Sequence, residues 1–177
     1  TFDLRQKYML EPDGWSRSVW QQYAKLGLLA LPFDQEVGGF SGTPVETMIV
    51  MEAFGAALAL EPYFDTVIVA GGILRHSDGS EQRNAVISEI INGGKTIALA
   101  HHERLARYTR TYVTTTAKRS GDGWILDGVK DYVPQGGSAD KLIVSARVSG
   151  ETDSTHGISL FIVDADTANL SRHIYPT

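Results

Sequence analysis

The side chains best suited to chemistry lie close together between His101 and Tyr112. Arg104, Arg107 and Arg110 are spaced three residues apart and lie next to Tyr108 and Tyr112. Because a guanidinium forms bidentate pairs with phosphate and carboxylate groups, these arginines could bind an anionic substrate. A charged run of this kind is also typical of a solvated loop, which is the default interpretation. The sequence leaves both interpretations open.

His101, His102 and Glu103 carry the donor types of a metal site, but their spacing argues against one. Adjacent side chains of an extended strand point to opposite faces, so the two histidines cannot converge. No second cluster of ligands lies nearby in the sequence, and the chain has no cysteine. We therefore expect no metal. A nucleophilic hydrolase is not indicated either, since the G-x-S-x-G motif is missing.

The composition is that of an ordinary soluble globular protein, with 42% hydrophobic and 21% charged residues in a chain of 177. A formal net charge of -5 favours neither nucleic acid nor an anionic membrane as partner. The absence of cysteine fits a reducing compartment, and we expect a cytoplasmic location. The first residue is not Met and the last residues form no closing cap, so we expect a piece of a longer protein.

The first half of the chain predicts helices. Ser16 can cap a helix, and Thr43-Pro44-Val45-Glu46 combines an N-cap, a first-turn proline and a glutamate three residues after the cap. The latter helix is expected to end near residue 60. A nearly all-apolar helix follows over about 63–76, and another starts at 78 or 80 and ends at 93–94.

After residue 94 the hydrophobic period becomes alternating, which predicts strands. Trp20 and Trp124 are both expected in a core. The fold class is α+β, with an N-terminal α-helical bundle domain over 1–94 and an antiparallel β-barrel or sandwich domain over 95–177. The expected strands are 96–100, 113–119, 124–126, 129–133, 142–147 and 158–163.

The segment 123–140 predicts a strand, a tight Asp-Gly turn and a second strand that ends at Tyr132. It resembles the middle β-domain of acyl-CoA dehydrogenases, in which a Leu-Asn-Gly-x-Lys-x-Trp-Ile-Thr segment leads into a glycine-rich loop. The stretches 26–40 and 157–164 are similar to further segments of that family, in the same order. Within the family, 11–16 and 44–55 look most like the small subunit of pimeloyl-CoA dehydrogenases.

The resemblance implies FAD as cofactor and an acyl-CoA thioester as substrate, which could be a dicarboxylyl thioester. Arg104, Arg107 and Tyr108 belong to the loop that lines the substrate entrance in the family. The family's flavin lies against two strands, whose counterparts here include Leu99, His101, His102, Tyr132, Val133 and Pro134.

The match to the family's Thr-Glu-Pro-x-x-Gly-Ser signature is incomplete. Only Glu103 is kept, while His102, Arg104 and Tyr108 stand where the family has Thr, Pro and Ser. Pro134 replaces a threonine and can donate neither a hydroxyl nor a backbone N–H. Two interpretations follow: a flavin bound through backbone groups with altered chemistry, or a subunit whose own flavin site has decayed.

Members of the family remove the α-proton of the thioester with a carboxylate base while the β-hydrogen leaves as hydride to the flavin. That base lies in a C-terminal helical domain, which this chain does not contain, and no residue present is assigned as the base. We expect a subunit of an acyl-CoA dehydrogenase, paired with a related second subunit in a homo- or hetero-oligomer and served by an electron-transfer flavoprotein. The alternatives are a non-catalytic, flavin-poor partner subunit and a flavin-dependent monooxygenase.

Overall fold

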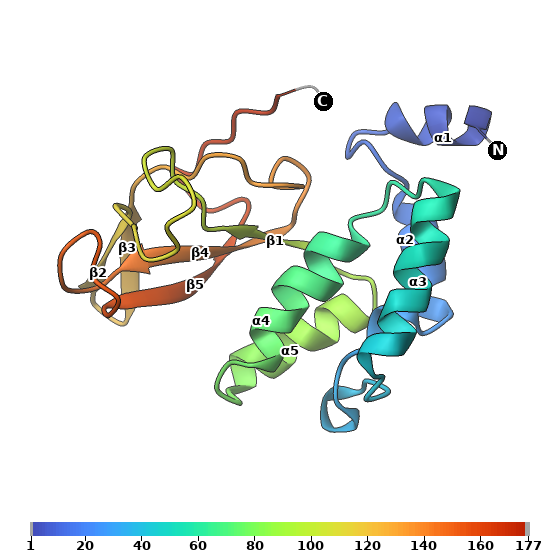
Figure 1. Cartoon of the computed structure of the whole chain (residues 1–177), viewed down its shortest axis with the longest axis horizontal. Coiled ribbons are helices and arrows are strands. Elements are labelled where there is room, and N and C mark those ends of the chain that lie inside the picture. The colour runs from blue at the N-terminus through green and yellow to red at the C-terminus, as the bar shows by residue number, and fades with distance from the viewer. Residues whose placement is uncertain (1, 176–177) are drawn as a thin grey trace. The chain divides into compact units, whose positions relative to one another are not determined.

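The computed structural model describes residues 2–175, and the chain divides between Ile97 and Ala98 into two compact units. The first unit is helical and the second is built on a β-sheet, so the predicted order of helices followed by strands is confirmed (Figure 1). The domain boundary expected after residue 94 stays a prediction.

The helices of the first unit are short, and α4 packs beside α5 (Figure 1). Within residues 2–175 every helix is too short or too polar to span a lipid bilayer. The helices are α1 (Phe2–Met9), α2 (Arg17–Lys25), α3 (Pro44–Ala57), α4 (Gly71–Arg75) and α5 (Glu81–Ile91), with 3-10 turns η1 (Leu28–Ala30) and η2 (Gln35–Val37).

The predicted starts of α3 and α5 are confirmed, because each helix begins directly after a capping side chain. The Thr43 hydroxyl accepts a hydrogen bond from the Val45 backbone N–H at 3.3 Å. The Glu46 carboxylate accepts from the Thr43 backbone N–H at 2.7 Å and so completes a capping box. Ser80 caps α5 by accepting from the Arg83 backbone N–H at 3.1 Å.

One predicted helix ends earlier than expected, and another is of mixed type. The helix α3 ends at Ala57, earlier than expected, since Leu58 adopts a left-handed φ of 51°. The helix expected over 63–76 is confirmed as a continuous helical run over 63–75, but its first part, η3 (Phe64–Ala70), is a π-helix and only its last part is α4. A segment that is apolar nearly throughout carries no period that separates the two kinds of helix.

Aromatic side chains form the core of the helical unit. Trp15, Trp20, Tyr23, Phe54 and Tyr63 follow one another with ring centroids 4.8 to 6.5 Å apart. Trp20 is fully buried, which confirms its predicted core position. Burial also raises the pKa of the Tyr63 phenol to about 12.

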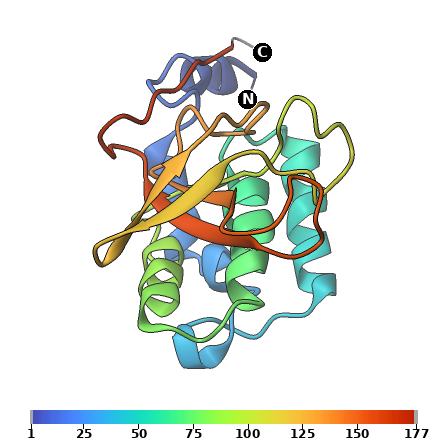
Figure 2. The ribbon, with the colours of Figure 1, turned by 90° about the vertical axis from the view of Figure 1, so that its left-hand side faces the viewer.

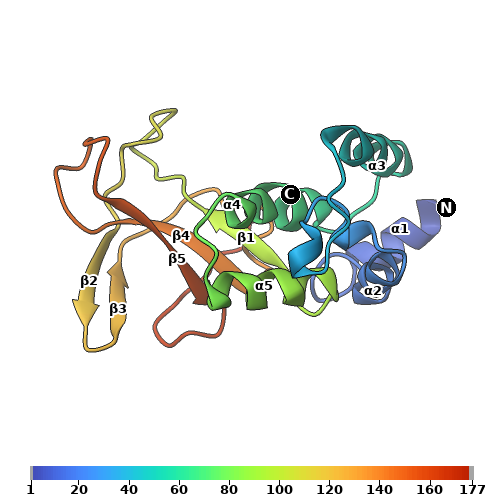
Figure 3. The same ribbon diagram turned by 90° about the horizontal axis from the view of Figure 1, so that it is seen from below.

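The second unit contains a five-stranded mixed sheet. β4 pairs with β5 in antiparallel register from Lys141 opposite Asp164 to Arg147 opposite Ile158, and β2 pairs with β3 as a hairpin that projects from the sheet (Figure 3). β2 meets β4 in parallel, so the sheet is not wholly antiparallel. The strands are β1 (Ile97–Ala100), β2 (Thr116–Ser120), β3 (Gly123–Asp127), β4 (Lys141–Arg147) and β5 (Ile158–Asp164).

Two predictions for this unit were wrong. The segment 129–133 is not a strand, because Tyr132 and Gln135 adopt left-handed φ angles of 51° and 57° that end any extended run. Trp124 is 44% exposed instead of buried, and its ring packs edge-on against Phe161 on the surface of the sheet. The strand β3 is exposed at most of its positions and β5 is mostly half-buried, whereas β4 beside it is buried (Figure 2).

Candidate functional site

Glu103 lies in the segment that follows β1 and is only 3% exposed. Its Oε2 accepts hydrogen bonds from the backbone N–H of Thr114 at 2.7 Å and from the Thr114 hydroxyl. Its Oε1 accepts from the backbone N–H and the hydroxyl of Thr115, at 3.0 and 2.7 Å. These donors replace the water that a buried carboxylate loses. Glu103 therefore joins the start of the segment 101–115 to its end.

Lys130 places its ammonium group on the same carboxylate. Its Nζ lies 2.6 Å from Glu103 Oε1, 3.0 Å from Ser145 Oγ and 3.3 Å from the carbonyl oxygen of His101. The side chains of Lys130 and Glu103 are 8% and 4% exposed, so this ion pair is shielded from solvent. We call Lys130, Glu103, Ser145 and His101 the Lys130 network.

The two charges of the network stabilise each other. Burial alone would raise the pKa of Glu103, but the hydrogen bonds from Lys130, Thr114 and Thr115 outweigh it and lower the pKa to about 2. Burial lowers the pKa of Lys130, and the adjacent carboxylate opposes that shift. Glu103 is therefore a weak base whose oxygens are already occupied, which makes it unsuited to remove a substrate proton.

His101, a predicted cofactor-binding residue, is hydrogen-bonded to a side chain in the interior of the sheet. Its Nδ1 lies 2.9 Å from Ser145 Oγ, and Ser145 is fully buried in β4. Burial lowers the pKa of the half-buried His101 ring, and the positive charge of Lys130 lowers it further. The imidazole is therefore neutral at pH 7.

His102 and Tyr132, from the two predicted flavin-binding segments, lie on neighbouring stretches of chain. The backbone N–H of Asp131 donates a hydrogen bond to the His102 carbonyl at 2.9 Å. The Nδ1 atom of His102 is buried and has no hydrogen-bond partner among residues 2–175. A buried polar atom without a partner is costly, so this nitrogen is suited to bind a polar group of a ligand.

The other predicted cofactor residues differ widely in exposure. Tyr132 is 85% exposed, and Pro134 is exposed as well. Val133 is half-buried and packs against the core cluster of Ala98, Ala100, Ala139, Leu142 and Val144. Leu99 is half-buried within β1. An exposed aromatic ring on the segment that pairs with the backbone of His102 is suited to stack against a flat ligand such as a flavin.

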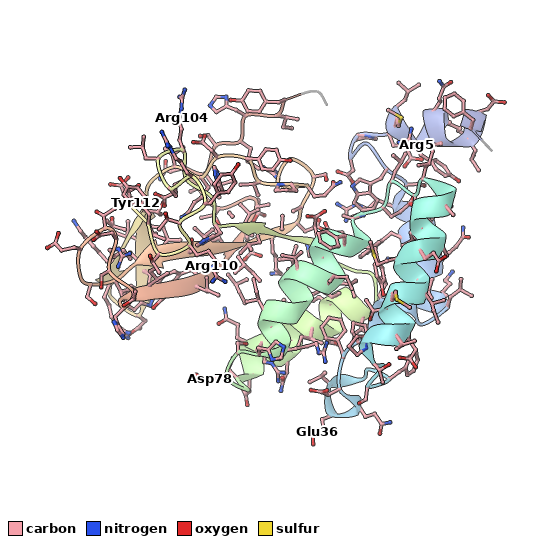
Figure 4. All side chains as sticks on the ribbon, in the orientation of Figure 1. Arg5, Glu36, Asp78, Arg104, Arg110 and Tyr112 are labelled. Carbon is pink, nitrogen blue, oxygen red and sulfur yellow. The ribbon has the colours of Figure 1, made fainter. Side chains whose placement is uncertain are left out.

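The predicted substrate-binding residues lie on an exposed loop. Arg104, Arg107 and Tyr108 are all exposed, and Tyr108 is fully so. Among residues 2–175, neither Arg104 nor Arg107 forms an ion pair with a carboxylate. Arg104 and Arg110 lie at separate places along the loop and do not point toward each other (Figure 4). Arg104 and Arg107 can therefore bind an anion, but the side chains of Arg104 and Arg110 do not converge on one point.

Sequence reasoning missed the residues that organise this site: Lys130, Ser145, Thr114 and Thr115. Two of them carried a usable signal: Lys130 stands at the lysine of the Leu-Asn-Gly-x-Lys segment, and Ser145 is a lone hydroxyl in the apolar run 142–146 of a buried strand. No three or more His, Cys, Asp or Glu side chains within residues 2–175 lie close enough to hold a metal ion.

Two family models match the chain. The acyl-CoA dehydrogenase N-terminal domain matches residues 5–94, and the acyl-CoA dehydrogenase middle domain matches residues 98–177. The mitochondrial long-chain specific acyl-CoA dehydrogenase of Mus musculus is 34% identical over 152 residues, which cover 84% of this chain and 35% of that protein.

A second relative and a solved structure extend the comparison. The caffeyl-CoA reductase-Etf complex subunit CarC of Acetobacterium woodii is 28% identical over 163 residues, which cover 91% of this chain and 43% of that protein. The solved FAD complex of PigA superposes with a TM-score of 0.84 at 20% identity, over 99% of this chain and 47% of that one. This likeness concerns the fold alone. The chain thus spans less than half the length of each of these proteins.

Proposed function

Because the chain belongs to the acyl-CoA dehydrogenase family, we propose that it forms the helical and β-sheet part of a flavin-dependent enzyme that oxidises an acyl-CoA thioester to its trans-2-enoyl form. The match of both family models, in the order and over the length of the two units, carries this proposal. The activity is proposed for the complete enzyme, since the chain spans 35% of the mouse relative.

FAD is the proposed cofactor. A bound flavin supplies the hydride acceptor for the oxidation. Support from this chain comes from the unpartnered, buried Nδ1 of His102 and from the exposed ring of Tyr132 on the neighbouring segment. His102 would bind a polar edge of the flavin and Tyr132 would stack on its face, while Pro134 offers no backbone N–H. PigA, whose fold this chain shares, was solved as a complex with FAD, which agrees with this choice.

We propose that the substrate presents an anionic group to the loop that carries Arg104 and Arg107, in addition to its thioester. That group is a phosphate of CoA or the distal carboxylate of a dicarboxylyl chain such as pimeloyl. The support is the pair of exposed arginines Arg104 and Arg107, which form no ion pair among the described residues. Guanidinium groups bind phosphate and carboxylate with two parallel hydrogen bonds. A pimeloyl-like substrate rests on sequence resemblance, since the relatives named above carry other names.

A second candidate is a non-catalytic, flavin-poor subunit that completes a heteromeric dehydrogenase. Pro134 favours it, because this residue removes both donors that a threonine would give to a flavin. A partner in a larger assembly is also supported by the name of the Acetobacterium woodii relative, which is a subunit of an Etf complex. We propose such an assembly for this chain as well, in the cytoplasm.

Flavin binding tests the proposal directly. The purified chain is titrated with FAD, and binding is followed by the visible spectrum and by quenching of flavin fluorescence. We expect His102→Ala to weaken binding about tenfold, as the loss of one hydrogen bond predicts. His173→Ala, at an exposed histidine of the same unit, is the control and should leave the affinity unchanged.

The co-expressed complete enzyme is then mixed with pimeloyl-CoA and, separately, with an uncharged acyl-CoA of equal length. Bleaching of the flavin band supports the dehydrogenase, and a preference for pimeloyl-CoA that Arg104→Ala removes supports the dicarboxylyl substrate. A chain that binds no FAD alone but lies in a complex with a bleachable flavin would establish the second candidate. The absence of flavin from both preparations would overturn the cofactor assignment.

A further inference from the structure

A single ammonium group lies where both ends of the segment 101–115 meet β4. We propose that Lys130 is a positioning residue, which fixes the proton of His101 on Nε2 through Ser145 and clamps the segment that carries His102 and the arginines. Only the expected effect of Lys130 on flavin binding rests on the proposed function. The arrangement itself follows from the donors and acceptors of the Lys130 network.

The direction of the hydrogen bonds is set by Lys130. An ammonium has three N–H donors and no acceptor, and its three oxygen neighbours belong to Glu103, Ser145 and His101. Ser145 Oγ must therefore accept from Lys130. Its own O–H is left with one acceptor, His101 Nδ1 at 2.9 Å, because Ser145 is fully buried and its hydroxyl has no other partner within residues 2–175.

The His101 ring then has only one possible tautomer. A neutral imidazole that accepts at Nδ1 carries its proton on Nε2. The hydroxyl donor at Ser145 therefore assigns the proton of the neutral His101 ring to Nε2.

The same network holds both ends of the segment. At its start, Lys130 binds the His101 carbonyl, and the next residue, Asp131, binds the His102 carbonyl at 2.9 Å. At its end, the Glu103 carboxylate accepts from Thr114 and Thr115. The exposed loop between these anchors is therefore fixed at its base, and the backbone that orients His102 is fixed with it.

Nitrogen NMR of the histidine side chains tests the tautomer without any ligand. In the intact chain we expect His101 to show a protonated, pyrrole-type Nε2 and an unprotonated Nδ1. Ser145→Ala removes the donor to Nδ1 and should give a mixture of tautomers, while Ser145→Thr should restore the single form. His173 serves as the internal control. A proton on Nδ1 in the intact chain, or a spectrum unchanged in Ser145→Ala, would overturn the proposal.

Flavin affinity tests the positioning role. Lys130→Met could unfold the chain, whereas Ser145→Ala keeps the Lys130–Glu103 pair and is the sharper variant. We expect it to weaken FAD binding about three- to tenfold, the range expected for one neutral hydrogen bond, and Ser145→Thr to recover most of the loss. Intact FAD affinity in Ser145→Ala would contradict the positioning role. A chain that binds no FAD but shows the expected tautomers would instead refute the proposed function and leave the tautomer assignment standing.

Discussion

The β-sheet unit buries two cations, and it satisfies them in opposite ways. Lys130 faces a carboxylate, whereas Arg147, at the end of β4, faces only backbone carbonyls and forms no ion pair among residues 2–175. The guanidinium donates to the carbonyls of Val113 at 3.1 Å, Thr111 at 2.7 Å, Thr152 at 2.8 Å and His156 at 2.9 Å.

The difference separates a charged site from a structural anchor. Removal of Lys130 would leave the buried charge of Glu103 without its partner, and an unpaired buried charge is among the costliest groups in a protein. Removal of Arg147 would leave neutral carbonyls, some on the loop 148–157 that water can reach. The Lys130 network should therefore be the more sensitive of the two, and the only one that responds to acid.

Lys130→Met should give the largest loss. We expect the free energy of unfolding to fall by about 3–5 kcal/mol, the cost of breaking a buried ion pair from one side. Urea denaturation followed by amide exchange in β4 and β5 measures it. Adding Glu103→Gln to Lys130→Met should recover part of the loss, because the stranded charge is removed. Lys118→Met, at an exposed lysine of β2, is the control. An equal loss of stability there would show that the cost does not come from the buried ion pair.

Acid should weaken the Lys130 network. The pKa of Glu103 is lowered from 4.5 to about 2 in the folded chain, so its stabilisation is complete above pH 4.5 and disappears as the pH falls to about 2. The full effect corresponds to about 3 kcal/mol. As the pH is lowered across this range, the free energy of unfolding should therefore fall more steeply for the intact chain than for Glu103→Gln. Glu52→Gln, at an exposed position of α3, should behave as the intact chain does.

Arg147→Met should have a smaller effect, about 1–3 kcal/mol, because several hydrogen bonds are lost but no charge is stranded. The loss should be independent of pH between 2 and 4.5, in contrast to that of the Lys130 network. Hydrogen exchange of the amides in 148–157 should rise most, since the guanidinium holds the carbonyls of Thr152 and His156. A pH-dependent loss in Arg147→Met would show that the two sites are coupled.

The sequence predicted most of the fold, since its signals there are local. The capping box at Thr43 and the cap at Ser80 lie within four residues of the helix starts they mark. The strand expected over 129–133 failed because the left-handed turn at Tyr132 is imposed by the surrounding structure and not by its residue type.

The candidate site was only half predictable. His101, His102 and Glu103 are contiguous and were identified together, but their roles depend on Lys130 and Ser145, which lie 27 residues from Glu103 and 44 residues from His101 in sequence. The motif around Lys130 marks its position but does not show that this lysine pairs with a buried carboxylate instead of facing water. The difference between Lys130, which pairs with a carboxylate, and Arg147, which binds only carbonyls, is therefore visible only in the three-dimensional structure.

Two neighbouring threonines allow the finest test of the Lys130 network. Thr114 and Thr115 both donate a hydroxyl to Glu103, but Thr115 is buried and Thr114 is exposed. Thr115→Val should cost about 2 kcal/mol and Thr114→Val about 1 kcal/mol, because water can replace the lost donor only at the exposed position.

The measurement is the free energy of unfolding in urea at pH 7, with Thr116→Val on exposed β2 as the control. Each valine should also raise the pKa of Glu103, since a donor to its charged form is lost, and so shift the acid-sensitive range toward higher pH. An equal loss of unfolding free energy at 114 and 115 would mean that water does not replace the lost donor at the exposed position. In that case the exposed loop at Arg147 should be as sensitive to lost hydrogen bonds as the buried network, and the two sites would differ in charge alone.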